Sequence, residues 1–128
     1  MIYLFFGVIA AVVTADLITK FTIDGILNSG ISWGLGAELD WLWIVIVVLS
    51  LVVAGVVVFM FFRAKQRPWL WTLGLGLFVG GILGNAIDRI ITGGAVHDFI
   101  NFVIFKNNLA DIAICVGAIL VGVRLAFR

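Results

Sequence analysis

The sequence predicts an all-α integral membrane protein, a bundle of four transmembrane helices in a single domain covering residues 1–128. Three observations predict this class. Hydrophobic residues make up 64% of the 128 residues and charged residues only 12%, whereas proteins on average contain about 45–50% apolar residues. Four apolar stretches reach the length of about 20 residues that a helix needs to cross a bilayer. Each stretch must be helical, because lipid offers no hydrogen-bond partner to a free backbone amide.

The four predicted spans are residues 2–21, 41–62, 69–91 and 109–127. The first lacks the basic start and the small-residue cleavage site of a secretory signal peptide, so we expect it to be retained. The second carries no charge and is the most uniform. The third contains Gly76, Gly80 and Gly84 at four-residue spacing, which indicates close packing against a neighbouring helix. The fourth begins directly after two asparagines.

Basic residues predict the orientation of the bundle. The connector 63–68, RAKQRP, holds three basic residues and no acid, and the C-terminal end adds Arg124 and Arg128. By the positive-inside rule, this connector and both termini are cytoplasmic. The loops 22–40 and 92–108 then face outward and are short, with at most a strand pair or a turn within 22–40.

Polar side chains gather at the outward ends of three spans. These residues are Asp16 and Lys20 in the first span, Asn85, Asp88 and Arg89 in the third, and Asn108 and Asp111 in the fourth. Residues three or four apart share one helix face. Ionisable groups in a span cost roughly 2.5–3.5 kcal/mol each and commonly mark function. One alternative is that Asp16–Lys20 and Asp88–Arg89 are ion pairs that only hold the bundle together.

Asp98 and Asp111 have no obvious cation beside them in sequence, with Lys106 the only nearby candidate. Two converging carboxylates repel each other, so that one stays protonated and the other ionised near neutral pH. The ionised carboxylate can take a proton from water, and the protonated one can polarise a carbonyl. This pattern favours an aspartic-protease dyad. The alternative is that Asp98 is a solvated loop residue.

Other classes of function find less support. The chain has no basic stripe, so we expect no nucleic-acid partner. Its single cysteine and single histidine cannot build a metal site or an internal disulfide, and we expect no metal and no cofactor. A small transporter or proton channel could use the outer-end acids, but such sites tend to lie near the membrane midplane, where these spans lack charge. A non-catalytic assembly protein that dimerises through the Gly76–Gly84 face is a further alternative.

Five short motifs, in order, resemble those of the signal peptidase II family, the bacterial lipoprotein signal peptidases. They are DLITK (16–20), NSGISWG (28–34), GNAIDR (84–89), GAVHDFI (94–100) and NLADIAI (108–114). The resemblance implies a four-span aspartic peptidase of the bacterial cytoplasmic membrane, with its active site toward the outer face. It also implies cleavage of prolipoproteins just before a cysteine that carries diacylglycerol, without a metal or cofactor and without a required oligomer.

The resemblance also implies roles for individual residues. Asp98 and Asp111 would be the catalytic aspartates. Supporting or substrate-binding roles would fall to Asp16, Lys20, Asn28, Gly30, Asn85, Asp88, Arg89 and Asn108. We expect Arg89 to bind a carbonyl or to order the dyad through Asp88. Two departures from the family pattern are a shorter segment between Lys20 and Asn28 and a short stretch between Asp98 and Asp111, in which Asn107 stands in place of an aromatic residue.

Overall fold

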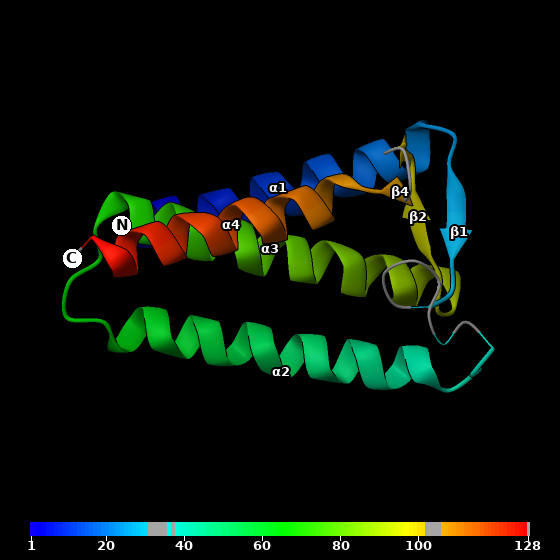
Figure 1. Ribbon diagram of the computed structural model, residues 1–128, viewed down its shortest axis with the longest axis horizontal. Coiled ribbons are helices and arrows are strands. Elements are labelled where there is room, and N and C mark those ends of the chain that lie inside the picture. The colour runs from blue at the N-terminus through cyan, green and yellow to red at the C-terminus, as the bar shows by residue number, and fades with distance from the viewer. Residues whose placement is uncertain (31–35, 37, 102–105, 128) are drawn as a thin grey trace.

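The computed structural model describes residues 1–30, 36, 38–101 and 106–127, and its main feature is a bundle of four long helices (Figure 1). The helices are α1 (Ile2–Thr22), α2 (Leu42–Arg63), α3 (Trp69–Thr92) and α4 (Leu109–Ala126). All four are long and apolar enough to cross a membrane. The four predicted spans are therefore confirmed, with every boundary within one residue of its predicted place.

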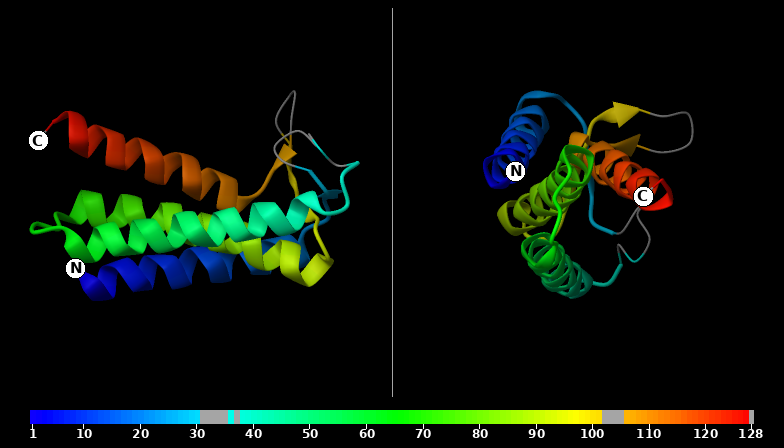
Figure 2. Two further views of the ribbon diagram at one scale, coloured as in Figure 1. Left: turned by 90° about the horizontal axis from the view of Figure 1, so that it is seen from below. Right: turned by 90° about the vertical axis from the view of Figure 1, so that its left-hand side faces the viewer.

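Helix α3 is the centre of the bundle and packs against α1, α2 and α4 (Figure 2). Both termini and the connection from α2 to α3 lie at one end, and all the described strands lie at the other (Figure 1). At the terminal end, the rings of Phe5 on α1 and Phe61 on α2 stack with centroids 4.1 Å apart. These rings belong to a buried core that also includes Leu75, Val79 and Ile82 of α3.

The glycine face of α3 packs against α1. A Cβ atom added at Gly76 would lie 3.0 Å from the Val8 Cβ, and one at Gly80 would lie 2.8 Å from the Val12 Cβ. At Gly80 an added Cβ would require a shift of the packed groups, and at Gly76 it would make an unusually tight contact with Val8. The predicted close packing is confirmed, and the face that the dimerisation alternative would use is covered within one chain.

Replacing Gly80 with alanine is expected to destabilise the bundle. The added methyl group has no room beside Val12, and overpacking of this kind typically costs about 1–3 kcal/mol. Gly55 of α2 is the matched control, because nothing lies within 4 Å of a Cβ placed there. Thermal unfolding in detergent should therefore begin at a lower temperature for Gly80→Ala than for Gly55→Ala. An equal effect of the two changes would contradict the packing described.

Two small antiparallel sheets cover the end of the bundle that is remote from the termini. Strand β1 (Ile26–Asn28) pairs with β2 (Val96–Asp98), with Ile26 opposite Asp98, and β3 (Ile100–Asn101) pairs with β4 (Lys106–Asn107). The expectation of a strand pair within 22–40 is therefore corrected. Strand β1 lies in that loop, but its described partner is β2, from the loop 92–108. Within the motif at 28–34, residues 31–34 lie outside the described part of the chain.

Glycines let the chain turn back toward the helices at this end. Gly93 ends α3 in the left-handed conformation, with φ of 76°, and the Gly94 amide donates to the Arg89 carbonyl at 2.8 Å. At Gly25, an added Cβ would lie 2.5 Å from the Asp98 carbonyl oxygen, so only glycine lets β1 approach β2 so closely. These turns bring Asp98 back over the ends of the helices.

Candidate active site

A polar cavity of about 120 Å³ lies at the strand end of the bundle. Its lining includes both Asp98 and Asp111, the two carboxylates that the sequence singled out. The other lining residues are Asn28, Asn85, Arg89, Val96, Lys106, Asn107 and Asn108. Together the lining residues come from β1, α3, β2, β4 and the start of α4, so the cavity joins segments between residues 28 and 111. The cavity has room for a few water molecules, each of which takes up about 30 Å³ in the liquid.

Asp98 is the last residue of β2 and its side chain is almost completely buried, with 4% of the residue exposed. It accepts hydrogen bonds from two amides, from Asn28 Nδ2 at 3.2 Å and from Asn108 Nδ2 at 2.8 Å. Burial raises the pKa of Asp98 above its ordinary value. The two amide hydrogen bonds oppose this rise, and the charge of Asp111 adds to it. The alternative of a solvated loop residue is therefore wrong.

Asp111 lies in the first turn of α4, and Asn108 is the N-cap of that helix. Asn108 Oδ1 accepts from the Asp111 amide at 3.0 Å, and Asp111 Oδ2 accepts from the Asn108 amide at 3.2 Å. This reciprocal arrangement is a capping box. Because Asn108 Nδ2 also donates to Asp98, one fully buried side-chain amide connects both aspartates.

Asn85 connects Asp111 to a buried lysine. Asn85 Nδ2 donates to Asp111 Oδ1 at 2.9 Å, and Lys20 Nζ donates to Asn85 Oδ1 at 2.8 Å. An ammonium group can only donate. Lys20 therefore holds the oxygen of the Asn85 amide toward itself and leaves the amide nitrogen facing Asp111.

The Lys20 ammonium also lies between two buried carboxylates. It is 2.7 Å from Asp16 Oδ2 and 3.6 Å from Asp88 Oδ2, and all three side chains are fully buried. Asp16 Oδ1 in turn accepts from the Ala110 amide at 2.8 Å, which attaches the start of α4 to α1. The predicted Asp16–Lys20 ion pair is confirmed, but it also positions the helix that carries Asp111.

Asp88 pairs with Lys20 and His97 rather than with Arg89. Its two oxygens accept from the His97 amide at 2.7 Å and contact His97 Nδ1 at 2.9 Å. Among the described residues, no ion pair joins Asp88 to Arg89. The Asp88–Arg89 ion pair considered from sequence spacing is therefore wrong, because adjacent residues on a helix point in different directions. Asp88 instead attaches β2 to α3 beside Asp98.

Arg89 extends toward the β1 side of the cavity. Its Nη2 donates to the Gly30 carbonyl at 3.1 Å, and the Gly30 amide donates to Asn28 Oδ1 at 3.0 Å. The guanidinium thus holds the turn that presents Asn28 to Asp98. The carbonyl that Arg89 contacts here belongs to Gly30 of the same chain, so binding of a substrate carbonyl by Arg89 stays a prediction. All ten site residues predicted from the sequence therefore belong to one connected network at this end of the bundle.

The site residues predicted from the sequence omit four contributors: His97, Val96, Lys106 and Asn107. The single histidine, His97, predicted no metal site, yet it holds Asp88, and Val96, Lys106 and Asn107 line the cavity. Alternation along β2 offered one signal, because neighbours on a strand point to opposite faces. Val96 and Asp98 are buried on one side, so His97 had to face the other. Nothing local in the sequence shows that Asp88 lies there.

The raised pKa of Asp98 predicts how its ionisation affects stability. The unfolded carboxyl titrates near 3.8, and the folded one at higher pH. Between those two pKa values the folded state binds more protons than the unfolded state. The free energy of unfolding therefore falls as pH rises through this window, and it stays lower at higher pH. An Asp98→Asn variant lacks this proton. Its thermal stability in detergent, relative to the unmodified chain, should therefore increase from pH 4 upward. A stability difference that is constant with pH would contradict the prediction.

The sequence profile of the Signal peptidase (SPase) II family matches residues 8–127. Among curated relatives, the lipoprotein signal peptidase of Blochmanniella pennsylvanica is 34% identical over 110 residues, covering 80% of this chain and 65% of the relative. That of Lactobacillus gasseri is 38% identical, covering 78% and 64%, and that of Lactiplantibacillus plantarum is 36% identical, covering 80% and 68%. The chain therefore spans about two thirds of the length of these relatives.

Two solved structures described as bacterial membrane enzymes share the fold. One superimposes with a TM-score of 0.83 at 23% identity, covering 95% of this chain and 87% of the other. The second has a TM-score of 0.80 at 25% identity, covering 94% and 91%. The arrangement of helices and strands is thus that of a known membrane-protein fold, and the comparison at the lower identity bears on the fold alone.

Proposed function

The chain belongs to the signal peptidase II family, and on that premise we propose that it is an aspartic endopeptidase that removes signal peptides from diacylglyceryl-modified prolipoproteins. Cleavage falls just before the lipid-modified cysteine, and Asp98 and Asp111 are the catalytic residues. The observation that carries this proposal is that both aspartates line one polar cavity and share the amide of Asn108. No metal or cofactor takes part.

In the proposed reaction, the pair of carboxyl groups holds one proton. Burial raises the pKa of Asp98, which helps the pair to keep that proton near neutral pH. The ionised carboxylate takes a proton from water as the water oxygen bonds to the scissile carbonyl carbon. The protonated carboxyl donates to the carbonyl oxygen. The carbon–nitrogen bond then breaks, a proton passes to the leaving amine, and the signal peptide keeps the new carboxylate.

The amide network has a defined role in this chemistry. Asn28, Asn85 and Asn108 donate to the dyad, and Lys20, Asp16, Asp88 and Arg89 hold those donors and the elements around them. Gly30 presents its carbonyl to Arg89. A dyad fixed in this way needs little rearrangement when charge develops, which is how preorganised sites lower a barrier. Asp98, Asp111 and the three amides that donate to them lie within one chain, and we propose that a second copy is not required.

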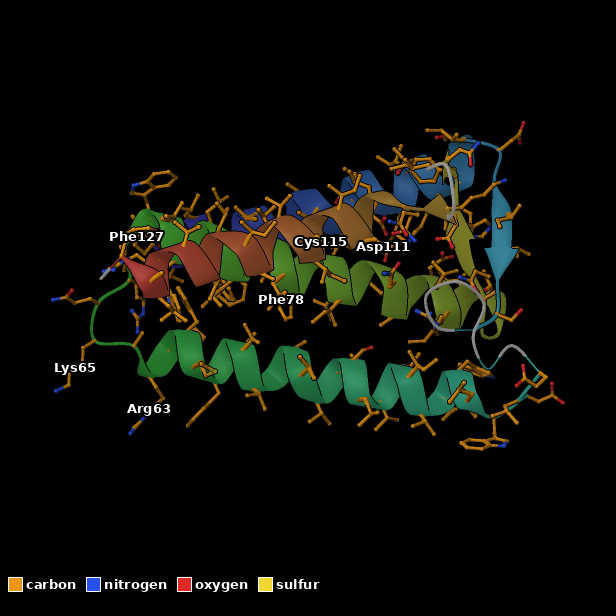
Figure 3. All side chains as sticks on the ribbon, in the orientation of Figure 1. Arg63, Lys65, Phe78, Asp111, Cys115 and Phe127 are labelled. Atoms are coloured by element: carbon orange, nitrogen blue, oxygen red, sulfur yellow. The ribbon has the colours of Figure 1, made fainter. Side chains whose placement is uncertain are left out.

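We propose that the strand end faces the outside of the bacterial cytoplasmic membrane and that both termini face the cytoplasm. The basic connector 63–68 and Arg124 lie at the terminal end, as the positive-inside rule requires for a cytoplasmic face. Asp111 lies toward the strand end of α4, whereas Arg63, Lys65 and Phe127 lie at the other end (Figure 3). A site at the outer membrane boundary suits a substrate whose lipid anchor keeps its cleavage point there. The middle of each span contains no charged residue that a transport site at the membrane midplane could use.

The proposal is tested by a gel-shift cleavage assay on the purified chain. The substrate is a prolipoprotein precursor with or without diacylglycerol on its cysteine, and mass spectrometry identifies the cleaved bond. We expect cleavage of the lipidated precursor only, directly before the modified cysteine. Cleavage elsewhere, equal cleavage of both precursors, or none of either in lipid bilayers would overturn the assignment.

A further inference from the structure

A second cavity lies at the terminal end of the bundle, remote from the candidate active site. Its volume is about 370 Å³, and it lies between the connection from α2 to α3 and the last turn of α4. Its lining includes Lys65, Gln66, Trp71, Arg124 and Leu125. None of these residues lines the active-site cavity. The proposed peptidase reaction therefore gives no account of it.

Among the described residues, the charged side chains that line this cavity, Lys65 and Arg124, are both basic. All seven acidic residues of the sequence lie between residues 16 and 40 or between 88 and 111, away from this end. Within the described part of the chain, neither Lys65 nor Arg124 forms an ion pair or a side-chain hydrogen bond. Arg67 differs, because its guanidinium donates to the carbonyls of Phe61 and Phe62 at 2.8 Å each. Arg67 thus caps the C-terminal carbonyls of α2, whereas the charged groups of Lys65 and Arg124 remain available to a ligand.

The start of α3 adds to the positive potential. Pro68 is the N-cap of this 24-residue helix, with no side-chain cap and no acid in the first turn. The first amides of a helix have no partner within it and carry partial positive charge. Pro68 and Trp71 both line the cavity. An anion bound between Lys65 and Arg124 would therefore also lie near free helix amides.

The surroundings favour a lipid over a free ion. Leu125 lines the cavity and is 42% exposed, and its neighbours at the ends of α3 and α4 are more exposed still, Trp69 at 62% and Phe127 at 80%. An exposed tryptophan at the end of a spanning helix, such as Trp69, marks the level of lipid headgroups, because its ring is amphipathic. We propose that this cavity binds the phosphate headgroup of an anionic phospholipid, whose acyl chains lie along the apolar surface beside Leu125.

The test measures lipid retention. The full chain is delipidated, mixed with phosphatidylglycerol and phosphatidylcholine in equal amounts, and analysed by native mass spectrometry. A Lys or Arg side chain that contacts the headgroup contributes about 5-fold to the binding of an anionic lipid. We therefore expect Lys65→Gln and Arg124→Gln each to reduce phosphatidylglycerol retention about 5-fold and the double variant about 25-fold, with phosphatidylcholine unaffected. Lys65→Arg keeps the charge and should retain the lipid.

Arg63→Gln is the matched control, because it removes one charge at the same end from a residue outside the cavity lining. It should leave retention unchanged, and an effect equal to that of Arg124→Gln would show a diffuse charge effect and overturn the site. Displacement of the lipid by inorganic phosphate at equal concentration would assign the cavity to a free anion instead. Because the readout is binding, the outcome is independent of whether the chain cleaves any precursor.

Discussion

Replacing either Asp98 or Asp111 with asparagine is expected to reduce cleavage of a lipidated precursor by about 10³-fold or more. Each carboxyl group is proposed to act in proton transfer, and general acid–base catalysis contributes about 10²–10⁴-fold. Asparagine has nearly the same shape as aspartate but cannot take a proton from water or donate one to a carbonyl. The loss should therefore appear in the turnover rate, while binding of the lipidated precursor stays within a few-fold of normal.

The double variant should be scarcely less active than either single variant, because residues that act as a unit give strongly non-additive losses. Asp24→Asn is the matched control: Asp24 is an exposed acid near the same end of the bundle and does not line the cavity. It should cleave at the normal rate. If both single variants retained activity within a few-fold of the unmodified chain, the dyad would not be the catalytic pair, whatever the family membership of the chain.

The four spans were predictable because lipid allows so few solutions. A stretch such as 41–62, with no charge and no proline, can only be a helix in a bilayer, and its ends are marked by Trp41 and the basic connector. The glycine face of α3 was predictable for a similar reason, since four-residue spacing of glycine has little use other than close packing. In both cases the information is local in the sequence.

The connections within the site are not local. Asn28 reaches Asp98 across 70 positions, and Asp16 reaches the Ala110 amide across 94. Spacing could place Asp16, Asp88 and Asp111 at one depth, but it could not select partners among them. Sequence spacing suggested an ion pair between Asp88 and its neighbour Arg89, whereas in the structure Asp88 contacts Lys20 and His97. The pairing of β1 with β2 was hidden for the same reason.

Replacing Lys20 with methionine is expected to have the largest effect on stability. Methionine fills a similar volume but leaves Asp16 and Asp88 buried without their shared cation. Removing one partner from a buried ion pair typically costs about 3–5 kcal/mol. Thermal unfolding in detergent should show this loss, whereas Lys65→Met, at an exposed position at the other end, should change little. Equal unfolding temperatures for the two variants would contradict the buried triad.

A second change separates the two roles of Lys20. Asp16→Asn in the Lys20→Met background removes one uncompensated charge and keeps an oxygen for the Ala110 amide, so part of the lost stability should return. Activity should not return with it. Without the ammonium, nothing described holds the Asn85 oxygen away from Asp111, and a rotated amide would present oxygen to a carboxylate. A double variant that recovers stability and full turnover together would show that Lys20 only balances charge, and that the orientation of Asn85 does not depend on it.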